Sequence, residues 1–74
     1  MKDKIQFYLE ILTPYGNYEG EVFEGDVEHY QGMIEVVKQF YSQEVFDTYL
    51  NDGSFLVMPK ELIKQSIVMV KVKH

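Results

Sequence analysis

The dipeptide Asp52-Gly53 lies between two runs of β-forming residues, and it constrains the fold more than any other short feature of this chain. The runs are "VFDTYL" over residues 45–50 and "SFLVM" over residues 54–58. Glycine readily adopts the left-handed conformation that a tight turn needs, so Asp-Gly between strand-forming runs is among the strongest local hairpin signals. The sequence therefore predicts a β-hairpin over residues 45–58.

Alternating apolar residues predict strands near both ends of the chain. In residues 5–12, one face would carry Ile5, Phe7, Leu9 and Ile11. In residues 67–73, one face would carry Val68, Val70 and Val72, and the other Ile67, Met69, Lys71 and Lys73. Before this last strand, Pro59 and "KELIKQ" predict a short helical connector, because proline suits the first position of a helix.

A turn and a returning strand are predicted after the first strand. "TPYGN" gathers residues that favour chain reversal. The segment 18–23 then has strand character, and Gly20 within it either weakens the strand or marks a bulge.

One helix is predicted from an N-cap at Asp26 to about Tyr41. Its apolar stripe, at steps of three and four residues, consists of Val27, Tyr30, Met33, Ile34, Val37, Phe40 and Tyr41. Gly32 inside it costs about 1 kcal/mol of helix propensity relative to alanine, which suggests a packing role through close backbone approach.

These elements give the order β-β-α-β-β-β in a single domain over residues 1–74. We expect an α+β fold: an antiparallel sheet of about five strands with one long amphipathic helix packed on one face. A partly closed small barrel is the alternative. The chain has 74 residues and no cysteine, so its stability must come from packing, with oligomerisation as a further source.

The formal net charge is −5, and all of the seven basic residues other than histidine are lysines. Phosphate backbones and anionic lipids both bind through basic residues, so this balance disfavours nucleic acid and membrane as partners. No apolar run approaches the roughly 20 residues that cross a bilayer, and the N-terminal residues carry charges where a signal peptide is apolar. We therefore expect a cytoplasmic protein, in a bacterium or an infected host cell.

The carboxylates near the predicted second strand are the chemical candidates. They are Glu19, Glu21, Glu24 and Glu28, together with the capping Asp26. Converging carboxylates bind hard cations or act as acid and base, so a small metal-dependent or acid–base enzyme is the alternative hypothesis. No EF-hand spacing, nucleophile motif or phosphate-binding loop accompanies them. The leading interpretation is an exposed acidic surface, with no catalytic residue, metal or cofactor.

A single helix covers only one face of a sheet, so apolar residues on the other face would need a partner. The predicted contact consists of Tyr8, Leu12, Phe23, Ile67 and Met69. We expect a non-enzymatic protein-interaction module that forms a homodimer through its sheet. Glu19, Glu21, Glu24 and Glu28 would steer a basic protein partner toward it.

The segment "DGSFLVMPKELIKQSIVMVKV", preceded by an acidic helix, resembles small uncharacterised proteins of tailed bacteriophages. The resemblance implies a host protein as the partner that is modulated, and it assigns no role to individual residues. The hairpin, helical turn and last strand also resemble the closing portion of an Sm-like or SH3-like barrel. That likeness covers the C-terminal third only, and the long helix and the lack of an RNA-binding motif depart from the pattern, so it transfers no function.

Overall fold

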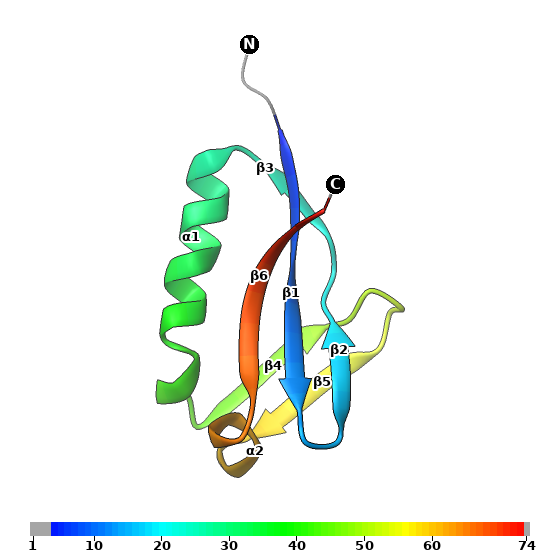
Figure 1. Ribbon diagram of the computed structural model, residues 1–74, viewed down its shortest axis with the longest axis vertical. Helices are drawn as coiled ribbons and strands as arrows, with labels where there is room; N and C mark the ends of the chain where they lie inside the picture. Colours follow the sequence, from blue (N-terminus) through cyan, green and yellow to red (C-terminus); the bar gives the residue numbers. More distant parts are fainter. Residues whose placement is uncertain (1–3, 74) are drawn as a thin grey trace.

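The computed structural model describes residues 4–73, and Figure 1 shows how the elements within them are arranged. The six strands are β1 (Ile5–Thr13), β2 (Gly16–Glu19), β3 (Phe23–Gly25), β4 (Val45–Tyr49), β5 (Phe55–Pro59) and β6 (Ile67–Lys73). The helical elements are α1 (Val27–Lys38), the 3-10 turn η1 (Phe40–Ser42) and α2 (Lys60–Lys64).

The strands of the described residues form two antiparallel sheets. In the four-stranded sheet, β1 pairs with β6 on one side and with β2 and β3 on the other, while β4 and β5 form a separate two-stranded sheet. The predicted α+β class and antiparallel pairing are confirmed. The prediction of one sheet of about five strands is wrong, and neither sheet closes into a barrel.

A bulge at residues 20–22 divides the predicted second strand into β2 and β3. Glu10 pairs with Glu19, so a regular ladder would place Val22 opposite Phe7, but Phe7 pairs with Phe23 instead. One extra residue is therefore inserted opposite β1, as in a β-bulge. Gly20 begins this segment and its N–H donates to the carbonyl of Leu9 at 2.8 Å, which confirms the sequence-based reading of Gly20 as a bulge marker.

The predicted hairpin is confirmed, and Asp52-Gly53 lies in its turn. β4 and β5 pair from Val45 opposite Pro59 to Tyr49 opposite Phe55. Gly53 has φ of 91°, in the region that disfavours residues with a Cβ atom. The backbone N–H of Ser54 donates to Oδ1 of Asp52 at 2.8 Å, so the aspartate side chain stabilises the turn.

This turn gives a prediction about pH. The hydrogen bond from the Ser54 backbone, followed by that from its hydroxyl, lowers the pKa of Asp52 from 3.8. Because the folded pKa lies below the unfolded one, the carboxylate contributes stability above pH 3.8 that is lost as the pH falls through the folded value. We expect an NMR titration of the Asp52 carboxyl carbon to have its midpoint below 3.8, and Ser54→Ala to keep most of the shift. A midpoint at or above 3.8 would contradict this turn geometry.

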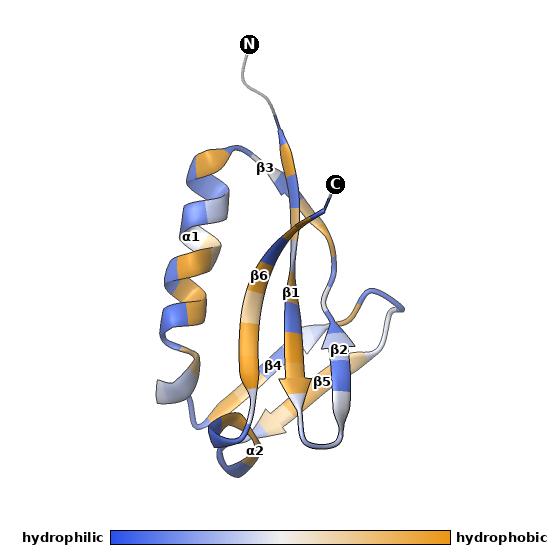
Figure 2. Cartoon of the chain, in the orientation of Figure 1, coloured by the Kyte–Doolittle hydropathy of each residue, from blue (hydrophilic) through white to orange (hydrophobic). Residues whose placement is uncertain are grey.

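The hydrophobic core lies where the hairpin crosses the four-stranded sheet. Its fully buried cluster consists of Ile11, Phe40, Met58 and Ile63, contributed by β1, η1, β5 and α2. Figure 1 shows β4 and β5 running diagonally behind one end of β1 and β6, and Figure 2 shows hydrophobic residues concentrated along these parts of the strands. We call the face of the four-stranded sheet that carries Phe7, Leu9 and Ile11 the inner face.

The helix α1 begins as predicted, and Asp26 is its N-cap. The Asp26 carboxylate accepts a hydrogen bond from the backbone N–H of His29 at 3.1 Å. The helix α1 ends at Lys38, and η1 continues it to Ser42, so the two form one bent helix over the range predicted to about Tyr41. In the described part of the chain no helix is long and apolar enough to cross a membrane.

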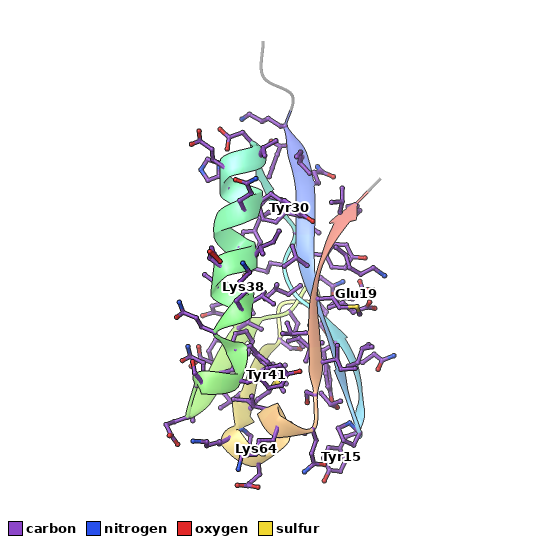
Figure 3. The ribbon with its side chains drawn as sticks, turned by 60° about the vertical axis from the view of Figure 1, so that its left-hand side comes forward. Tyr15, Glu19, Tyr30, Lys38, Tyr41 and Lys64 are labelled. Carbon is purple, nitrogen blue, oxygen red and sulfur yellow. The ribbon has the colours of Figure 1, made fainter. Side chains whose placement is uncertain are left out.

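The helix covers the inner face only in part. The ring of Tyr30 packs edge-on against Phe7, with centroids 5.7 Å apart, and Figure 3 shows Tyr30 between α1 and β1. None of the residues of α1 is fully buried. The predicted packing role of Gly32 is wrong, because no heavy atom outside the neighbouring helix backbone lies within 4 Å of the position that a Cβ atom would take there.

Candidate functional site

The β4–β5 hairpin has two apolar faces, and only one of them is covered. Phe46, Leu56 and Met58 point toward the core. Side chains alternate along a strand, so the residues between them point to the other side. We call this set the hairpin face: Val45, Asp47, Tyr49, Phe55, Val57 and Pro59.

Four large apolar side chains of the hairpin face are more than half exposed. The exposed fractions are 51% for Val45, 57% for Tyr49, 52% for Phe55 and 55% for Val57. Tyr49 and Phe55 are opposite one another across the two strands, and their rings are 4.8 Å apart. Contiguous apolar surface of this kind marks interaction sites on soluble proteins.

The described residues expose more large hydrophobic side chains than they bury. Seven hydrophobic residues form the buried core, whereas twelve large ones are exposed. The hairpin face holds the densest group of exposed ones, because its four members occupy adjacent or diagonal positions on paired strands.

Acidic groups surround the hairpin face. Asp47 lies within it, opposite Val57. Glu44, directly before β4, forms an ion pair with Lys60 at 3.0 Å. At the other end, the N–H of Glu21 donates to the carbonyl of Tyr49 at 3.3 Å, and a shallow hollow is lined by Glu21, Tyr49, Leu50, Asn51 and Gly53.

Four of the five predicted contact residues lie together on the other side of the four-stranded sheet, which we call the outer sheet face. Leu12 pairs with Ile67. Met69 pairs with Glu10, which is two residues from Tyr8 on β1 and points to the same side of the sheet. Ile67 is 55% exposed, while Tyr8, Leu12 and Met69 are partly buried. Three of these four apolar residues are thus less exposed than the apolar residues of the hairpin face.

Phe23 is not part of the outer sheet face. It pairs with Phe7, so it lies on the inner face, with the two rings 6.1 Å apart. A regular second strand would have placed Phe23 beside Gln6 on the outer side, and the bulge at residues 20–22 moves it to the opposite side.

An ion pair lies within the outer sheet face. Nζ of Lys71 is 3.2 Å from Oε1 of Glu10. The hydrogen bond that the Lys71 ammonium donates to Glu10, and then the negative charge of Glu10, raise the pKa of Lys71. Both charges are therefore compensated inside the chain.

The predicted acidic residues are spread over several elements. Glu19 lies on β2 and accepts a hydrogen bond from the Asn51 amide at 3.1 Å. Glu21 lies in the bulge, Glu24 on β3, and Glu28 in the first turn of α1. All four are exposed. Within residues 4–73, no group of three aspartate, glutamate or histidine side chains lies close enough together to hold a metal ion.

The sequence interpretation missed the hairpin face. A signal was present, because "VFDTY" and "FLVMP" are apolar at most positions on both faces instead of alternating. Such continuous runs are typical of strands covered on two sides. In this fold the core covers one face of the hairpin, and the other face is exposed to solvent.

Searches for similarity to known protein families, to curated proteins and to solved structures gave no match for this chain.

Proposed function

We propose that this protein acts by binding other proteins and not by catalysis. The observation that carries the proposal is the hairpin face, where four large apolar side chains are each more than half exposed. Covering such side chains contributes roughly 25 cal/mol per Å2 of apolar surface removed from water. A partner protein supplies that cover in the proposed function.

We further propose that the chain self-associates through the outer sheet face, as a homodimer. Tyr8, Leu12, Ile67 and Met69 would form the apolar contact. The ion pair between Glu10 and Lys71 favours this arrangement, because these two charges compensate one another when a second copy covers them. Symmetric dimers are also the commonest assembly of small soluble chains.

The hairpin face then remains open for a different partner. Following the resemblance to bacteriophage proteins, a host protein is the proposed partner, and occlusion of its surface the proposed mechanism. The exposed Glu19, Glu21, Glu24 and Glu28 would speed its approach if it is basic, since electrostatic steering acts mainly on the association rate.

Sedimentation equilibrium tests the self-association. We expect the wild-type chain to approach twice the monomer mass, Ile67→Lys to sediment as a monomer, and Val57→Lys to remain dimeric. The two substitutions are matched, since both side chains are 55% exposed on strands. A wild-type monomer at all concentrations would rule out the dimer. Loss of the dimer in Val57→Lys alone would move the contact to the hairpin face.

A further inference from the structure

Asp47 is the one charged side chain of the hairpin face, and it occupies the middle of that face. The cross-strand pairs are Val45 with Pro59, Asp47 with Val57, and Tyr49 with Phe55. Its carboxylate is exposed and, in the described part of the chain, forms no ion pair. Any protein that covers the apolar neighbours of Asp47 therefore also covers this carboxylate.

Covering Asp47 without a counter-charge is costly, because a carboxylate loses its hydration. A second copy of this chain supplies no counter-charge at that point. In a centred face-to-face pairing about a two-fold axis, Asp47 meets either Asp47 or Val57 of the other copy, according to the direction of the axis. The first arrangement opposes like charges and the second buries the carboxylate against a methyl surface, so self-pairing is disfavoured on this face.

The charged residues at the edges of the hairpin face also favour a partner that carries a cation. Lys60 is the cation near the Pro59 end, and its charge is already paired with Glu44. Asp52 lies in the turn at the opposite end, and Glu21 is fixed beside Tyr49 by a backbone hydrogen bond. The surroundings of the apolar side chains are thus acidic, and they attract a cation on the partner.

We propose that the hairpin face binds a segment of another protein in which an arginine or lysine is flanked by large apolar side chains. The cation lies against the Asp47 carboxylate, and the apolar side chains cover Val45, Val57 and Phe55. Tyr49 is two residues along the same strand, about 7 Å away, so its ring is within reach of a guanidinium bound at Asp47. This inference rests on the proposed protein-binding function and adds the chemistry of the partner.

The test uses the intact chain, labelled with nitrogen-15, and two ten-residue peptides observed by NMR at low salt. Both peptides carry leucine and phenylalanine at alternate positions, and they differ only at the centre, where one has arginine and the other glutamine. We expect the arginine peptide to shift amides of β4 and β5 and to bind about tenfold more tightly than the glutamine peptide.

Two matched variants assign the preference to one carboxylate. Asp47→Asn keeps the shape of the side chain and is expected to make the two affinities equal. Glu35→Gln removes the same charge from an exposed position on α1 and is expected to keep the tenfold preference. Circular dichroism confirms that both variants are folded.

The outcomes separate this inference from the function on which it rests. Equal binding of both peptides to the wild-type hairpin would overturn the role of Asp47 and leave the protein-binding function standing. Shifts confined to β3 and α1 would place the cation on the other carboxylates and overturn the inference. Failure of both peptides to bind at millimolar concentration would remove the hairpin face as a binding site, whatever the sedimentation result.

Discussion

Replacing Phe40 by alanine is expected to remove about 3–5 kcal/mol from the free energy of unfolding. Phe40 is 1% exposed and packs with Ile11, Met58 and Ile63 in the fully buried cluster. Its ring also contacts that of Phe46, with centroids 5.0 Å apart. A domain of this length has roughly 4–11 kcal/mol of stability in total, so the variant loses a large part of it. Urea denaturation followed by circular dichroism measures the change.

Phe55→Ala is the matched control for this prediction. The same side chain is deleted, but Phe55 is 52% exposed and contacts Tyr49 on the open side of the hairpin. Its loss is expected to cost only about 1 kcal/mol. Equal losses for the two variants would show that the hairpin face is covered in solution, or that the core does not centre on Phe40.

Replacing Gly25 by alanine is expected to destabilise the protein by about 1–3 kcal/mol. Gly25 is buried directly before the capping Asp26. A Cβ atom there would lie 2.7 Å from Cβ of His29 and 2.8 Å from its Cγ. Neither atom is at the far end of a flexible side chain, so the first turn of α1 must move and its cap is strained.

Gly32→Ala gives the opposite expectation and serves as the control. Gly32 is an exposed position within the same helix, and no atom outside the neighbouring helix backbone lies within 4 Å of the added methyl group. Alanine is favoured there by about 0.5–1 kcal/mol. Thermal unfolding of both variants measures the contrast, and a Gly25→Ala variant as stable as the wild type would contradict the close approach of β3 and α1.

Local signals in the sequence predicted most of the elements. Asp52-Gly53 located the hairpin, because a tight turn restricts which residues it accepts. Asp26 located the start of the helix, because a side-chain acceptor is needed by its free N–H groups. Alternation placed Val68, Val70 and Val72 on one face of the last strand, and the register of β6 shows that this face lies beside the inner-face residues of β1.

The arrangement of the elements was harder to predict, because it depends on contacts between distant residues. A one-residue bulge reverses which side of the sheet a strand residue faces, and this is why Phe23 was assigned to the wrong side. The sequence pattern also does not indicate which face of the hairpin packs against the core. Both faces are apolar, so the choice is made by packing against Ile11, Phe40 and Ile63, and the hairpin face was missed.

The bulge at residues 20–22 also sets how the two sheets are joined. In the described residues, two backbone hydrogen bonds join the sheets: the N–H of Glu21 donates to the carbonyl of Tyr49, and the N–H of Asn51 donates to the carbonyl of Glu19. They flank the isolated β-bridge between Gly20 and Leu50. Elsewhere the two layers meet through side chains, which allow small sliding movements. The bulge therefore joins the turn end of the hairpin to the four-stranded sheet through the backbone, while the opposite end of the hairpin is held by side chains packed around Met58 and Ile63.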